Sequence, residues 1–166
     1  DEPPKREGRG VFLARFPEII AVDVSEFCQY RIYLAAPLFS EAERSYNTAL
    51  ADLLRQHLFE VYVPQEIGDD TAHRDLTENT RIYEQNKKAL HEADLVVAVI
   101  DGADADSGTA WEMGYAAALN KPVFALRTDF RKVGTHEHVN LMLEQSATVV
   151  TSRDDLLRLL KSPLLC

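Results

Sequence analysis

The sequence predicts an α/β fold in which a doubly wound, five-stranded parallel sheet forms the centre of a three-layer sandwich. Five short apolar runs alternate with segments of helical period, the order that gives βαβ units with right-handed crossovers. Among these runs, Leu95–Ile100 is apolar throughout, which is typical of a strand buried on both faces. The 166 residues are enough for one domain with its own hydrophobic core.

The predicted strands are short and rich in apolar side chains. They are Arg31–Ala36, Glu60–Val63, Leu95–Ile100, Pro122–Leu126 and Ala147–Val150. Pro64 ends the second strand, because proline has no N–H to donate to a neighbouring strand.

Each strand is followed by apolar residues at helical spacing, which predicts a helix. The first helix begins at Ser40, because Glu43 has the spacing of a capping box, and the last begins at Ser152, with Asp155 in the same relation. The others are predicted over about Thr77–Ala93, Thr109–Leu119 and Val139–Gln145.

For five such strands we expect the flavodoxin-like arrangement, in which ligands bind beyond the carboxyl ends of the strands where the winding reverses. This rule predicts a site at the loops after the first and third strands, Ala36–Ser40 and Asp101–Gly108.

Composition excludes several classes of partner. A formal charge of −9 argues against nucleic acid, and no apolar run approaches the roughly 20 residues that cross a bilayer, so no membrane partner is expected. Two cysteines, Cys28 and Cys166, are too few for a disulfide framework, and we expect a cytoplasmic protein. The histidines form no metal-binding motif and no glycine-rich phosphate loop occurs, so neither a metal nor a cofactor is predicted.

The chain divides into an N-terminal extension, residues 1–29, which we expect to be partly mobile, and one domain, residues 30–166. The extension begins with a polar stretch that contains prolines and glycines, and it lacks the features of a signal peptide.

Acidic residues gather after the third strand, at Asp101, Asp104 and Asp106, and Glu112 follows on the next predicted helix. One interpretation is a solvated loop in which Thr109 and Glu112 form a capping box. The other is a carboxylate nucleophile, Glu112, with Asp106 as its acid/base partner on the other side of one pocket. The spacing alone favours neither.

Two polar residues lie where apolar ones are expected. Asn86 is on the inner face of the second helix, where it either bonds to backbone or contacts a ligand. Tyr33 is inside the first strand, either as a core residue or as a residue that orients a carboxylate.

Five segments in order resemble the nucleoside 2-deoxyribosyltransferase family: Arg31–Phe39, Ala93–Ala98, Asp106–Ala116, Leu126–Arg131 and Val139–Met142. The block D-S-G-T-x-x-E-x-G at Asp106–Gly114 is the most specific of them. The resemblance covers roughly residues 31–160 and implies cleavage of the N-glycosidic bond of a 2′-deoxynucleoside, with transfer of the deoxyribosyl group to another nucleobase, as in nucleotide salvage.

The resemblance also implies residue roles. Glu112 takes the place of the glutamate that forms a covalent glycosyl-enzyme, Asp106 that of the aspartate that handles the base and its proton, and Tyr33 that of the tyrosine that orients the nucleophile. Substrate-binding residues are expected at Phe39, Asn86, Asp101, Gly108, Asn140 and Met142.

The resemblance further implies a homo-oligomer built from dimers, of which a hexamer is one form, with Asn140 completing the neighbour's site. Some family members have an aspartate where this chain has Asn86, and an amide cannot protonate a base, so base preference stays open.

Two alternatives remain. One is an N-glycosidase that hydrolyses 2′-deoxynucleoside 5′-monophosphates, although Pro37, Leu38 and Phe39 stand where such relatives place glycine and serine. The other is a non-catalytic nucleoside-sensing module whose acidic loop only binds its ligand.

Overall fold

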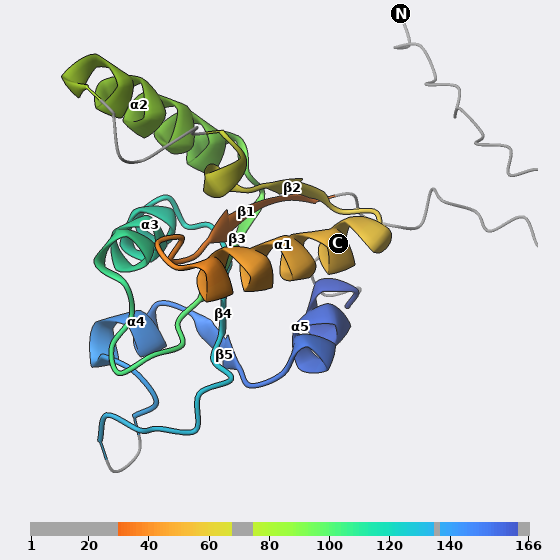
Figure 1. The fold of residues 1–166 in the computed structure, drawn as a ribbon. Helices are drawn as coiled ribbons and strands as arrows, with labels where there is room; N and C mark the ends of the chain where they lie inside the picture. Colours follow the sequence, from red (N-terminus) through yellow and green to blue (C-terminus); the bar gives the residue numbers. More distant parts are fainter. Residues whose placement is uncertain (1–29, 68–74, 135–136, 163–166) are drawn as a thin grey trace, which may run out of the picture.

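The computed structural model describes residues 30–67, 75–134 and 137–162. Its sheet contains β1 (Arg31–Ala35), β2 (Glu60–Tyr62), β3 (Leu95–Val99), β4 (Val123–Leu126) and β5 (Thr148–Val150). All neighbouring strands are parallel, in the order β2-β1-β3-β4-β5 (Figure 1). The predicted α/β fold class is therefore confirmed.

The helices connect these strands. They are α1 (Glu41–Gln56), the short 3₁₀ helix η2 (Pro64–Glu66), α2 (Leu76–Glu92), α3 (Ser107–Ala118), α4 (Leu141–Gln145) and α5 (Arg153–Leu160). No helix of the described ranges is both long and apolar enough to cross a membrane. The predicted extension, residues 1–29, lies outside the described residues.

Two apolar cores fill the two faces of the sheet, because side chains of a strand alternate between its faces. On one face, α1 and α5 pack through Leu54 and Leu156 against strand residues such as Leu34. On the other, α2 and α3 pack through Leu90 and Met113. Figure 1 shows α1 and α5 on one side of the sheet and α3 on the other.

The winding reverses between β1 and β3, which pair with each other in the middle of the sheet. The chain leaves β1 toward α1 on one face and leaves β3 toward α3 on the other. The loops that follow these two strands therefore diverge at the carboxyl edge, where the strand order predicts a ligand site.

Helix caps confirm two of the five predicted helix starts. Ser40 and Glu43 form the expected capping box of α1, and the Ser152 side chain accepts from the Asp155 N–H at the start of α5. The predicted start of α3 at Thr109 is wrong, because Asp106 is its N-cap. The capping-box interpretation of Glu112 is therefore excluded, since Thr109 lies inside the helix.

Candidate active site

Tyr33 of β1 and Glu112 of α3 meet above the middle of the sheet. The Tyr33 hydroxyl donates a hydrogen bond to Glu112 Oε1 over 2.5 Å. Tyr33 is fully buried and projects from the face of β1 that α3 covers. Glu112 lies on α3 and is half-buried, and its bond to Tyr33 holds its side chain close to the core.

The surroundings of Glu112 change its protonation. Burial raises the pKa of this carboxyl to about 7, and the charge of Asp106 acts in the same direction. The hydrogen bond from Tyr33 opposes them, because it stabilises the ionised carboxylate. The pKa of Tyr33 is raised, chiefly by burial and then by the charge of Glu112, so its hydroxyl stays a donor.

Glu112 lines a cavity of about 330 Å³ between α2 and α3, which we call the Glu112 cavity. Its other lining residues come from β1, α2 and α3: Tyr33, Tyr83, Asn86, Lys87, Leu90, Gly108 and Trp111. The lining is mostly apolar, with Glu112 and Asn86 among its few polar groups. Such a combination is typical of a small-molecule site, in which a few polar groups orient an apolar ligand.

An aromatic row forms the outer wall of this cavity. The Trp111 ring lies 6.0 Å from that of Tyr83, and it stacks on Tyr115 at 5.0 Å with the planes 10° apart. The Tyr115 hydroxyl in turn lies 2.5 Å from Nε2 of His91. Tyr115 thus covers one face of the Trp111 ring, while Trp111 lines the cavity and is 47% exposed, which suits contact with a planar base.

Asp106 stands at the beginning of α3, next to the cavity rather than in its lining. Its Oδ2 accepts the Thr109 N–H at 3.0 Å, the bond of an N-cap. A side chain at Gly108 would place its Cβ 3.1 Å from the same oxygen, so this glycine leaves room for the carboxylate. Asp106 is close enough to Glu112 to raise its pKa.

Asn86 is held by a residue that the sequence did not single out. The Tyr62 hydroxyl donates to Asn86 Oδ1 at 2.9 Å, so a side chain and not a backbone group holds this carbonyl. The Tyr62 ring also stacks on Tyr33, with centroids 5.4 Å apart. Tyr62 and Tyr33 are register partners on β2 and β1, and this pairing places both rings on one face.

Asp101 does not reach the Glu112 cavity. Its Oδ1 accepts the backbone N–H groups of Thr128 and Asp129, and its Oδ2 accepts the Thr128 hydroxyl. Buried Arg127, which directly follows β4, donates to the carbonyls of Ile100 and Gly102. These bonds join the loop after β3 to the loop after β4 and hold the segment that leads to Asp106.

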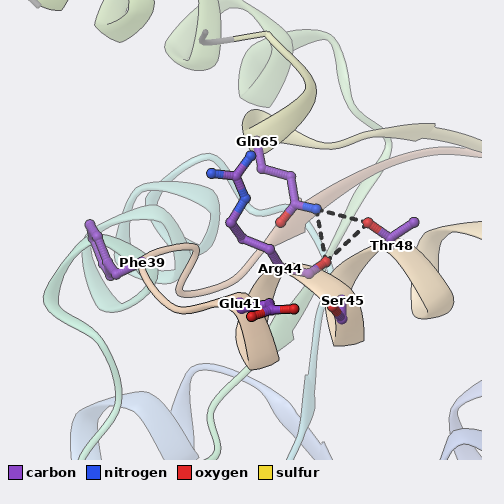
Figure 2. Close-up of a pocket in the computed structure, with 6 residues that line it drawn as sticks. All are labelled: Phe39, Glu41, Arg44, Ser45, Thr48 and Gln65. Carbon is purple, nitrogen blue, oxygen red and sulfur yellow. Dashed lines mark hydrogen bonds between the residues drawn. The ribbon is translucent and has the colours of Figure 1, made fainter. Parts of the chain in front are cut away.

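Phe39 lines a second hollow of about 490 Å³, on the other side of the β1–α1 loop. Its walls come from α1 and η2, and Figure 2 shows Gln65 bonded to the Thr48 hydroxyl and the Arg44 carbonyl. The Phe39 side chain is 76% exposed. The two hollows share no lining residue, so within this chain Phe39 is not brought to Glu112.

Asn140 and Met142 lie at the beginning of α4, outside the lining of the Glu112 cavity. Asn140 is the N-cap and accepts the Met142 N–H at 3.0 Å. The Met142 side chain is 75% exposed, which leaves it available to another molecule.

Across residues 30–67, 75–134 and 137–162, no group of three histidine, cysteine or carboxylate side chains could hold a metal ion. His138 instead bonds to Glu144 at 3.0 Å.

Of the predicted site residues, the fold thus brings Tyr33, Asn86, Gly108 and Glu112 together around one cavity, with Asp106 beside them. The sequence did not predict Tyr62 or Lys87. Tyr62 could have been found from its place at the end of the second strand, since neighbouring parallel strands align their carboxyl ends at one edge.

One family model and one curated relative match this chain. The family model described as nucleoside 2-deoxyribosyltransferase matches residues 32–151. An uncharacterized protein of Ureaplasma parvum is 33% identical, over 69% of this chain and 78% of its own length.

Solved structures are similar to this chain as well. A conserved protein of Enterococcus faecalis superposes with a TM-score of 0.67 at 33% identity, over 81% of this chain and 98% of that one. The 2-deoxyribosyltransferase of Bacillus psychrosaccharolyticus superposes with a TM-score of 0.66 at 25% identity, over 76% of this chain and 89% of that one.

Proposed function

The chain belongs to the nucleoside 2-deoxyribosyltransferase family, and from that premise we propose that it transfers the 2-deoxyribosyl group of a 2′-deoxynucleoside to another nucleobase. One observation carries the proposal: the Glu112 carboxylate lines a largely apolar cavity and is held there by the Tyr33 hydroxyl at 2.5 Å.

The reaction proceeds in two displacements at C1′. In the reacting form the two carboxyls hold one proton between them, on Asp106, while Glu112 is ionised. An oxygen of Glu112 attacks C1′ while the glycosidic C1′–N bond breaks, and the departing base takes this proton from the Asp106 carboxyl. The nitrogen of a second base then attacks C1′, the ester bond to Glu112 breaks, and Asp106 recovers the proton. Carboxylates divide the work in the same way in retaining glycosidases.

Tyr33 keeps the nucleophile in place. Its hydroxyl occupies Oε1 of Glu112 and leaves Oε2 free for C1′. Positioning of this kind lowers the barrier because the reacting atoms need no further ordering. The bond also stabilises the ionised carboxylate, the form that can attack.

Trp111 supports transfer over hydrolysis. Its ring, stacked on Tyr115, offers a flat apolar surface beside Glu112. A base stacked there excludes water from the glycosyl-enzyme and is itself the next nucleophile.

We also propose that the site is completed in a homo-oligomer. Asn140 and the exposed Met142 lie outside the cavity of their own chain. In this proposal they reach the cavity of a neighbouring subunit, where the Asn140 side chain contacts the sugar.

Incubation of the protein with deoxyinosine, with and without free adenine, tests the proposed reaction. We expect deoxyadenosine to form only when adenine is present, and Glu112→Gln to abolish the exchange. Glu60→Gln is the matched control, because Glu60 is an exposed residue at the opposite, amino-terminal end of the strands.

Other results would reject the proposal in identifiable ways. Release of free deoxyribose at a rate independent of adenine would indicate a hydrolase. Binding of nucleosides without any exchange would indicate a sensing module, and full activity of Glu112→Gln would remove the assigned nucleophile.

A further inference from the structure

Tyr62 makes a contact that the proposed reaction does not use. Its hydroxyl carries one proton, and this proton is directed at Oδ1 of Asn86 over 2.9 Å. Tyr62 itself does not line the Glu112 cavity; it lies behind Asn86 and against the Tyr33 ring. It therefore acts on a ligand only through its neighbours.

The contact decides which end of the Asn86 amide is free. An amide has a carbonyl that accepts and an NH₂ that donates, and here the carbonyl is taken by Tyr62. The Nδ2 group makes no hydrogen bond within residues 30–67, 75–134 and 137–162. Since Asn86 lines the cavity, the group that it offers to a ligand there is its NH₂, a hydrogen-bond donor.

We propose that Tyr62 is a specificity-determining residue, which fixes Asn86 as a hydrogen-bond donor and so selects bases with an exocyclic oxygen over bases with an exocyclic amine. This inference rests on the proposed function, because it assigns the base subsite to the Glu112 cavity.

The selection follows from the edges of the bases. An unrestrained asparagine reads adenine with both ends of its amide, the carbonyl to the amine and the NH₂ to N7. With the carbonyl engaged, only the donor remains. N7 accepts in all of these bases and does not discriminate, so the selection is made at position 6. There the donor matches the oxygen of hypoxanthine or guanine and opposes the NH₂ of adenine, and an unmatched polar group in such a site disfavours the wrong ligand.

Tyr62→Phe tests the proposal, because it keeps the ring that stacks on Tyr33 and removes only the hydroxyl. The measurement is kcat/KM for hypoxanthine and for adenine as acceptors, from initial rates with deoxyguanosine as the common donor. We expect the wild type to prefer hypoxanthine and the variant to lose about tenfold of that preference, the effect of one mismatched hydrogen bond. Asn86→Asp, which can only accept, is expected to prefer adenine.

Tyr46→Phe is the matched control. The Tyr46 hydroxyl is buried and has no hydrogen-bond partner in the described part of the chain, and its ring lies against the other core. We expect this variant to keep the wild-type ratio of kcat/KM for hypoxanthine to kcat/KM for adenine. A structural role for Tyr62 would lower both acceptor rates by one common factor and leave the ratio unchanged, and that result overturns the proposal.

Calorimetric binding of free hypoxanthine and adenine separates this inference from the proposed reaction. If the wild type exchanges bases but its preference does not depend on Tyr62, the inference alone is wrong. If no exchange occurs at all, the proposed function fails, and the inference then fails too unless the binding ratio still changes in Tyr62→Phe.

Discussion

Tyr33 donates to Glu112 over 2.5 Å, and this bond connects the middle of the sheet to helix α3. The two residues are 79 positions apart in the chain. One is fully buried and the other is half-exposed at the wall of a cavity, so the bond fixes a carboxylate at the boundary between core and ligand space. Protonation of Glu112 should therefore affect both folding and chemistry.

The first prediction concerns stability. Burial raises the Glu112 pKa from 4.5 to about 7, so between these values the native state binds more protons than the unfolded state. The free energy of unfolding contributed by Glu112 then falls as pH rises through this window. Glutamine does not titrate, so the free energy of unfolding of Glu112→Gln, measured relative to that of the wild type, should rise by about 3 kcal/mol as pH increases from about 4.5 to about 8.

Urea unfolding of both proteins across this pH range measures the difference between their free energies of unfolding. The titrating groups that the two proteins share contribute equally and cancel in this difference. Glu60→Gln, at an exposed position, should show no such trend. A stability difference between Glu112→Gln and wild type that does not vary with pH would contradict the raised pKa.

The second prediction concerns the pH dependence of the reaction. The nucleophile must be ionised, so the rate of glycosyl-enzyme formation should rise with pH through about 7. Tyr33→Phe removes the bond that lowers the Glu112 pKa, and the rising limb should move to higher pH. We expect at least about a tenfold loss of single-turnover rate near neutrality, since hydrogen bonds to charged groups are among the stronger ones.

Part of this loss should be recovered at higher pH, where Glu112 ionises even without Tyr33. Tyr46→Phe serves again as the control. If Tyr33→Phe lowered the rate equally at every pH, Tyr33 would not act through the ionisation of Glu112.

The third prediction separates two roles of Asp106. Asp106→Asn keeps a side-chain oxygen for the Thr109 N–H, whereas Asp106→Ala loses the cap of α3 and should cost about 1 kcal/mol of stability. Both variants lose the proton donor, and we expect both to exchange bases about 10²–10⁴-fold more slowly. Thermal unfolding and exchange assays measure the two effects. An active Asp106→Asn protein would show that Asp106 is a cap and nothing more.

The fourth prediction concerns the oligomer. If Asn140 completes a neighbour's cavity, Glu112→Gln and Asn140→Ala should each be inactive alone. Mixing the two after dissociation and reassembly should restore part of the activity, because some cavities then combine a wild-type Glu112 with a wild-type Asn140. Two Asn140→Ala preparations treated in the same way are the control, and failure of the mixture to recover, with oligomers formed, would count against a shared site.

Local patterns in the sequence were sufficient for the sheet. The bounds of each strand were predicted to within a residue or two. A short, wholly apolar run such as that of β3 is stable mainly as a strand buried between two layers of helices. Caps marked α1 and α5 correctly. They misplaced the start of α3, because Asp106 and Thr109 are both good capping residues and only the path of the preceding loop selects between them.

In the candidate site, too, local patterns predict only the residues that are close together in the sequence. Asp106 and Glu112 are close in sequence, and the first turns of α3, which Asp106 caps, keep them close in space. The contacts of Tyr62 with Asn86 and Tyr33, and the placement of Phe39 at a separate hollow, depend on which strands are neighbours and in what register.

The sequence by itself thus determined the order of strands and helices, the acidic loop and the residues within one turn of it, since short-range periodicity and capping fix these. Only the tertiary structure decided which distant side chains share the Glu112 cavity and which way the Asn86 amide is turned. A hydrogen bond between two side chains requires their atoms to be within about 3 Å, and that condition is set by strand pairing and helix packing rather than by any local pattern.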